Sequence, residues 1–342
     1  MKKVLRCMGM MALVALAFTS CKKDENKPES MFYASAAEVN VENLDENRAY
    51  KDGNDKFHFE QGDVCMVFNI DKETPTNSHA ALYGAVGEGV TNVPFYNIGY
   101  GEVAEDMLDG YYAFYPGGPG HTVTYLANGE NKCKFYVAPE QEYRGDTVPR
   151  GHFYAAATNY VGTHMMEDAH FFFRPIMGVL RLLPFEEAQR TVTRIEIVDH
   201  AWMLSGLVEL IIPEVNPTEM EALFNQFNPD DAAYMQRLNE YKVRVGYNVT
   251  DEEILDPVTG ITTHYVKGNR MVLNVPEGAQ LGTDRDNTPA FNIALRPLAL
   301  CRGFHVIFTF DNGETKTVDA SAWNRPIKFN TVSTIGVNLD NY

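Results

Sequence analysis

Short apolar runs that end at glycine, proline or asparagine turns recur along most of this 342-residue chain. One such run is Tyr111–Tyr115, which stops at the turn-forming segment Pro116–Gly120. Another two runs, Phe304–Phe310 and Thr315–Val318, flank the turn Asp311–Glu314. Runs of this length between such turns are typical of the β-strands of sandwiches and barrels. The sequence therefore predicts a mainly β fold.

The same turn chemistry predicts two β-hairpins in the C-terminal part of the chain. The first pairs the two runs on either side of Asp311–Glu314. The second pairs His264–Val266 with Met271–Val275 across the turn Lys267–Asn269. Glycine and asparagine favour such hairpins because they adopt the positive φ angles that tight turns require.

One segment, Thr218–Tyr241, departs from the strand pattern. Thr218 and Glu221 fit a capping box, and apolar residues then recur at helical spacing. Pro229 ends this helix, and a second helical stretch follows it. The pattern predicts a helical insertion at residues 218–241 whose apolar stripe packs against a sheet.

The N-terminus reads as an export signal covering residues 1–20. A short basic region is followed by the apolar run Cys7–Phe18, which is too short to span a bilayer. Thr19 and Ser20 then precede Cys21, which resembles a bacterial lipobox and predicts a lipidated cysteine. The alternative is an ordinary cleavable signal followed by an unrelated cysteine.

Residues 21–30 are polar and charged, so we expect a flexible tether after the lipidated Cys21. Lys23–Glu25 resembles a lipoprotein export signal for the outer face of the outer membrane. The alternative is a generic solvated linker. These features predict an outer-membrane, lipid-anchored protein that is exposed on the cell surface.

The net charge is −17, and removal of the three basic residues of the signal takes it to −20. A chain this acidic is a poor nucleic-acid binder, because such proteins need lysine and arginine to displace phosphate counterions. Common hydrolase, nucleotide-binding and metalloprotease motifs do not occur in the sequence. His164, Glu167, Asp168 and His170 form the densest set of potential metal ligands, but a solvated loop explains them. We expect no enzyme activity, cofactor or metal.

Three cysteines, Cys65, Cys133 and Cys301, remain after Cys21 is lipidated. Each lies in an apolar run, where cysteine acts as a small hydrophobic residue. The sequence leaves undecided whether Cys65 and Cys133 form a disulfide, and no spacing supports this bond. Thr147 follows an aspartate in a short pattern that resembles an acceptor site for O-glycosylation.

Four segments, taken in order, carry a resemblance to a known family: Phe57–Val64, Tyr111–Pro116, Val137–Gln141 and His170–Leu182. They resemble segments of the fimbrillin-like family, which comprises the subunits of type V pili, and the resemblance implies a place on the cell surface or in fimbriae. The match covers nearly the whole chain after the signal. Within the last segment, Arg174-Pro175 departs from the family pattern, which usually has a histidine there.

This resemblance implies two transthyretin-like β-sandwich domains in tandem. Residues 31–167 would form the N-terminal sandwich. Residues 168–342 would form the C-terminal sandwich, with residues 218–241 as a helical insertion. The insertion is not a general element of the family.

The resemblance also implies a mechanism of assembly. An Arg-specific protease would cut between Arg48 and Ala49 and remove an N-terminal strand. The opened groove would then accept a donor strand from a neighbouring subunit. The alternative is that Arg48 is simply a solvent-facing residue. Within the removable strand, the candidate plug residues are Phe32, Val39 and Val41.

The sequence therefore predicts a structural or adhesive pilus component, as a tip, anchor or accessory subunit. Its expected partners are the outer membrane, other pilus subunits, and a host protein or glycan. The alternative is a stand-alone outer-membrane lipoprotein that binds host or dietary glycans. Aromatic platforms would favour that alternative, and the candidates for them are Tyr96, Tyr100, Trp202 and Trp323.

Overall fold

The structure is a computed structural model. It describes residues 31–36, 40–43, 58–69, 80–89, 91–100, 111–117, 132–145, 155–159, 170–211, 215–245, 248–250, 252–255 and 262–342. The signal peptide, Cys21, the tether and four predicted site residues lie outside these ranges. Those four residues are Val39, Arg48, Ala49 and Thr147.

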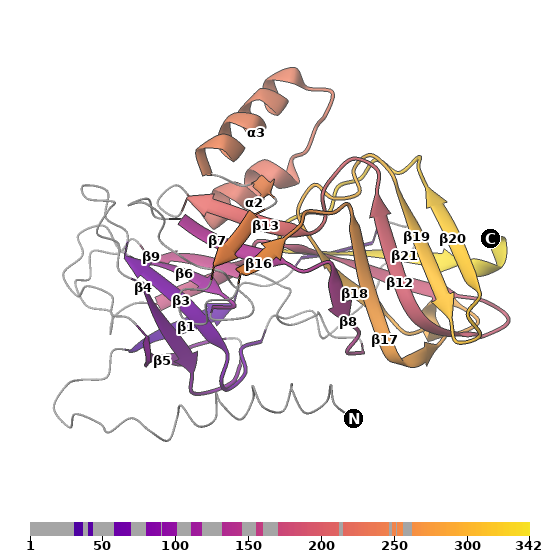
Figure 1. Ribbon diagram of the computed structural model, residues 1–342, viewed down its shortest axis with the longest axis horizontal. Coiled ribbons are helices and arrows are strands. Elements are labelled where there is room, and N and C mark those ends of the chain that lie inside the picture. Colours follow the sequence, from indigo (N-terminus) through magenta and orange to yellow (C-terminus); the bar gives the residue numbers. More distant parts are fainter. Residues whose placement is uncertain are drawn as a thin grey trace. The chain divides into compact units, whose positions relative to one another are not determined.

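Seven strands form a closed barrel in the order β1-β10-β9-β6-β3-β4-β5 (Figure 1). The ring of Phe59 fills its interior and lies edge-on to Phe95, Tyr115 and Phe173. The strands are β1 (Met31–Ala36), β3 (Val64–Asn69), β4 (Ala80–Ala85), β5 (Val93–Tyr100), β6 (Tyr111–Tyr115), β9 (Ala155–Asn159) and β10 (His170–Pro175).

Two further sheets have a sandwich-like arrangement. The first has the order β18-β11-β21-β2, and the second has the order β20-β19-β12-β17-β8. The strands of the first are β2 (Asn40–Asn43), β11 (Gly178–Phe185), β18 (Phe291–Leu295) and β21 (Thr331–Asn338). Those of the second are β8 (Glu140–Glu142), β12 (Thr191–Asp199), β17 (Arg270–Gln280), β19 (Phe304–Phe310) and β20 (Thr315–Ala320).

The remaining elements are two small sheets, two helices and two 3-10 turns. Asn216 caps α2 through its side chain, so the cap lies two residues before the predicted Thr218. The strands are β7 (Lys132–Val137), β13 (Gly206–Ile211) and β14 (Asn248–Thr250), then β15 (Glu252–Leu255) and β16 (Thr262–Tyr265). The helices are α2 (Pro217–Asn225) and α3 (Ala232–Val245), and the 3-10 turns are η4 (Arg285–Asn287) and η5 (Leu339–Asn341).

The mainly β fold is confirmed, and so are the two predicted helical stretches, the second of which extends past residue 241 to Val245. The tandem transthyretin-like sandwiches stay a prediction. The hairpin of β19 and β20 is also confirmed, since these strands pair antiparallel around the predicted turn. The predicted pairing of β16 with β17 is wrong. β16 pairs with β15, whereas β17 lies between β12 and β8, where its apolar residues are buried. Packing on the larger sheet therefore outweighs the local turn signal.

The division into domains at residue 167 stays a prediction. In the described part of the chain, four of the five sheets contain strands from both sides of that position. In the barrel, for example, β10 lies beside β1, and in the sandwich β2 lies beside β21. The two halves therefore share hydrogen-bonded sheets.

Among the described residues, no helix is long and apolar enough to cross a membrane.

A buried carboxylate ties the turn after β11 to the sandwich. Glu186 is fully buried, and Arg190 donates to both of its carboxylate oxygens, at 2.9 and 2.6 Å. The ammonium of Lys316 lies 3.6 Å from it, and Arg190 also reaches Glu314. Burial alone would raise the pKa of Glu186, but the hydrogen bonds and charge of Arg190 outweigh this and lower it.

We expect Glu186→Gln to lower the free energy of unfolding by about 2 kcal/mol, because two cations lose their shared partner. A lowered native pKa means that this stabilisation is complete above the pKa of an unfolded glutamate, about 4.3. It is lost as the pH falls through the native pKa. Urea unfolding at several pH values measures this difference. The exposed neighbour Glu187 provides the control Glu187→Gln, and an equal loss in that variant contradicts the interpretation.

Candidate functional site

The candidate site is the slot that strand β1 fills in the barrel. β1 pairs antiparallel with β5, where Met31–Ala34 face Tyr96–Val93. On its other edge it pairs in parallel with β10, where Tyr33–Ala36 face His170–Phe173. β1 therefore connects β5 to β10 and completes the ring of strands. Without β1, the facing edges of β5 and β10 would be unpaired and the barrel would be open.

Phe32 anchors β1 in the barrel interior. It is fully buried, and its ring centroid lies 5.1 Å from that of Phe95, 5.0 Å from that of Tyr83 and 4.8 Å from that of Phe171. These partners come from β5, β4 and β10. Ala34, two residues on, is also fully buried. Alternate residues of β1 therefore fill the barrel, as expected for a strand with one inward face.

Polar contacts also hold β1 in the ring. Ser35 is almost fully buried, and its hydroxyl oxygen lies 2.9 Å from Nε2 of His170. The same oxygen accepts a hydrogen bond from the backbone N–H of Asn92, at 3.1 Å. Ser35 thus joins β10 and the start of β5. The sequence marked His170 as a potential metal ligand and as the start of a segment that resembles the family, and it did not indicate this contact with β1.

The N-terminal segment reaches a second sheet through β2. Asn40–Asn43 pair in parallel with Thr331–Thr334 at the edge of the sheet that contains β21. Both β1 and β2 precede Arg48 in the sequence. The predicted plug Phe32 is buried in the barrel, whereas Val41 lies on β2 and its side chain is outside the described part. The candidate site thus combines a slot in the barrel with an edge of the sandwich.

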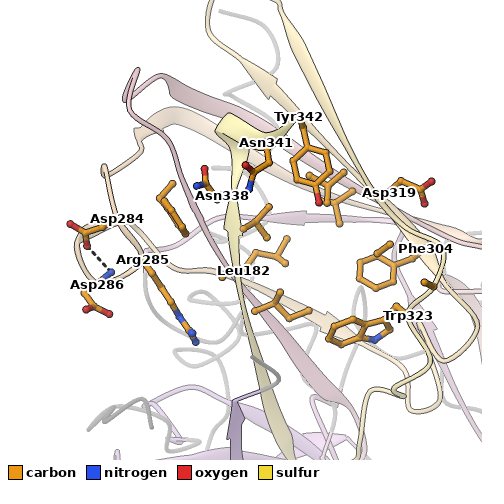
Figure 2. A pocket seen from close by; sticks show the side chains of 18 of the residues that line it. Leu182, Asp284, Arg285, Asp286, Phe304, Asp319, Trp323, Asn338, Asn341 and Tyr342 are labelled. Carbon is orange, nitrogen blue, oxygen red and sulfur yellow. Dashed lines mark hydrogen bonds between the residues drawn. The ribbon is translucent and has the colours of Figure 1, made fainter. Parts of the chain in front are cut away.

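The sandwich also contains a mostly apolar cavity of about 1050 Å³ (Figure 2). Strands from both of its sheets line the cavity, among them β11, β19, β20 and β21. Trp323, a predicted aromatic platform, is at one end, where its ring lies edge-on to Phe304. Its indole N–H donates to the carbonyl of Arg325. Trp323 is therefore a wall of this cavity and not a free-standing platform.

The other predicted platforms are scattered over the fold. Tyr96 faces Met31 across β5 and β1, and Trp202 lies in the turn after β12. The side chain of Tyr100 is outside the described part.

Within the described part of the chain, no group of three or more histidine, cysteine or acidic residues is placed so that it could hold a metal ion.

All three predicted structural cysteines are buried and free. The Cys65–Cys133 disulfide that the sequence left open is therefore absent. Burial raises the pKa of both of these thiols above the usual value. Cys65 and Cys133 thus act as small apolar residues, as the sequence predicted.

No family model matches the chain, and no curated protein sequence is similar to it. Solved structures do resemble it. One is a suspected cell adhesion protein from Bacteroides uniformis, with 13% identity, a TM-score of 0.46 and coverage of 93% of this chain and 94% of that one. Another, a suspected cell adhesion protein from Bacteroides ovatus, has 12% identity, a TM-score of 0.45 and coverage of 92% and 94%.

A fimbrial protein from Bacteroides ovatus also resembles the chain, with 9% identity and a TM-score of 0.38. That similarity covers 91% of this chain and 49% of the other. The solved structures similar to this chain therefore include proteins described as adhesive or fimbrial.

We expect Phe32→Ala to lower the free energy of unfolding by about 3 kcal/mol, because the ring leaves a cavity among three aromatic partners. Hydrogen exchange should become faster at the amides of β1. The neighbouring Tyr33 is exposed, so Tyr33→Ala should change stability by less than about 0.5 kcal/mol. Urea unfolding and hydrogen exchange test both variants. Equal effects at the two positions would argue against Phe32 as the anchor.

Proposed function

We propose that the protein is a cell-surface lipoprotein of the fimbrillin-like type that assembles with other pilus subunits by strand exchange. Its role is structural or adhesive, not catalytic. The observation that carries this proposal is the position of β1, an N-terminal strand paired on both edges in an otherwise open ring. Lipidation of Cys21 would tether the protein to the outer membrane.

The order of elements along the chain supports cleavage at Arg48. β1 and β2 both lie before this residue, and the remaining barrel strands all follow it. A single cut after Arg48 would therefore separate β1 and β2 from the rest of the chain. Loss of β1 would uncover Phe95 and Phe171 together with two unpaired strand edges.

Such a groove favours an extended donor strand over other ligands. Backbone groups on both edges supply hydrogen bonds, and the uncovered rings accept apolar side chains at alternate positions. A donor with an aromatic residue in the register of Phe32 would restore the packing. Exposed strand edges and apolar surface also make the empty groove a poor end state. Strand exchange is therefore the function that this geometry supports best.

We expect an Arg-specific protease to cut the full chain once after Arg48 and to leave the remaining barrel folded. Intact mass identifies the cut, and denaturing and native gels identify oligomers. Detergent-resistant oligomers would support self-assembly. Cleavage without oligomers would assign the chain to a tip, anchor or accessory role, in which the donor comes from a different subunit. Resistance at Arg48 in a folded chain overturns the proposal.

Two variants control this experiment. Arg48→Ala should prevent the cut, whereas Arg144→Ala, at an exposed site beyond β8, should leave it unchanged.

A synthetic peptide of residues 31–43 should bind the cleaved chain and block the formation of oligomers. The same peptide with Phe32→Ala should bind at least about tenfold more weakly, because its anchor is missing. Equal binding of both peptides would contradict the role of Phe32.

A further inference from the structure

We propose that Lys242, Arg296 and Trp202 form a binding site for the anionic group of an acidic saccharide, such as a carboxylate or a sulfate ester. The source of the ligand rests on the proposed role at the cell surface. Three segments that are distant in the sequence meet here. They are the C-terminal half of α3, the turn between β12 and β13, and the loop between β18 and β19.

Two cations converge on the indole ring of Trp202. Nζ of Lys242 lies 4.7 Å from the centroid of this ring and 5.9 Å from that of Phe224. The guanidinium carbon of Arg296 lies 5.5 Å from the same indole centroid. Arg296 is only 6% exposed. A chain with a net charge of −17 thus places two basic groups beside one aromatic ring.

The described residues do not place a carboxylate within ion-pair distance of Lys242. Asp199, the buried acidic residue at the end of β12, already accepts three backbone hydrogen bonds. Its Oδ1 accepts hydrogen bonds from the backbone N–H groups of Ala201 and Trp202, at 2.8 and 2.9 Å. Its Oδ2 accepts one from the N–H of Leu300, at 2.6 Å. Asp199 therefore joins the two loops, and no carboxylate among the described residues competes with an external anion for the ammonium of Lys242.

Backbone strain in the β18–β19 loop is a second, independent observation. Leu298 and Leu300 both have φ of 66°, a left-handed conformation that bulky residues rarely adopt. Such conformations persist only where the surroundings enforce them, and they cluster at binding sites. Here the hydrogen bond from the backbone N–H of Leu300 to Asp199 holds Leu300 in this conformation. The strained loop lies between Arg296 and Cys301, whose thiol accepts a hydrogen bond from the indole N–H of Trp202.

The electrostatics of the cluster favour the binding of an anion. Burial first, and then the charge of Arg296, lower the pKa of Lys242 to about 8. The titratable and charged groups that act on Lys242 are Arg296 and Cys301. An anion placed against the ammonium would stabilise its charged form and raise its pKa again. Because neutral Lys242 binds an anion less well, affinity should fall as the pH rises through about 8.

Binding can be followed by the fluorescence of Trp202 in the full chain. The sequence has two tryptophans, so a Trp323→Phe background leaves Trp202 as the reporter. The probes are glucuronate, its neutral counterpart methyl glucoside, and acetate, which has the carboxylate without the sugar. We expect glucuronate to bind more tightly than either of the other two. Lys242→Met should weaken glucuronate binding at least about tenfold, because a charge-assisted contact is lost.

Two variants separate a specific contact from a general loss of charge. Arg237→Met removes an exposed charge from the same helix, α3, and should leave the affinity unchanged. Lys242→Arg should retain binding and lose its pH dependence near 8, because arginine stays charged there. Equal affinity in Lys242→Met and the parent overturns the site. Absence of glucuronate binding at millimolar concentration also overturns it, and acetate that binds as tightly as glucuronate overturns the saccharide source.

This experiment does not involve cleavage at Arg48 or a donor strand. A failure of glucuronate binding therefore leaves strand exchange untouched. A chain that resists the protease at Arg48 likewise leaves the anion site standing. The two proposals thus fail by different measurements.

Discussion

Closure of the barrel by β1 is the constraint on which the N-terminal half depends. The unpaired edges of a β-sheet invite pairing with other chains unless they are covered or otherwise protected, and a closed barrel removes such edges altogether. Here the ring closes only because Met31–Ala36 hydrogen-bond to β5 on one side and β10 on the other. Phe32 fills the aromatic interior from the same strand. One short segment thus supplies both the last hydrogen-bonded ladder and part of the core.

The same N-terminal segment also links the barrel to the sandwich, because β2 adds to the edge of β21. Further strands link the halves: β8 joins β17 and β7 joins β13. Cleavage after Arg48 would release β1 and β2 only, so the β7 and β8 pairings would remain. This physical difference explains how a strand could be exchanged without dismantling the fold.

Local patterns predicted local structure, and they failed where distant segments meet. The turn Asp311–Glu314 identified the β19–β20 hairpin, and the apolar spacing around Phe224 identified the helices. The parallel pairing of β1 with β10 has no local signal, since Ser35 and His170 are 135 residues apart. Parallel strands need long crossovers, so their partners are set by packing and not by turns. The sequence did not predict the Lys242 cluster for the same reason, because three separate segments build it.

The two proposed sites differ in how far they depend on particular side chains, and this difference follows from what each site must do. An exchangeable strand should be held mainly by backbone hydrogen bonds, which any strand can replace, together with one or two anchors such as Phe32. An anion site instead needs fixed side chains, because misplaced cations lose most of their advantage over water. Asp199 supplies that rigidity by clamping the two loops around Trp202 through three backbone N–H groups. A replaceable strand and a clamped loop therefore suit assembly and ligand recognition, respectively.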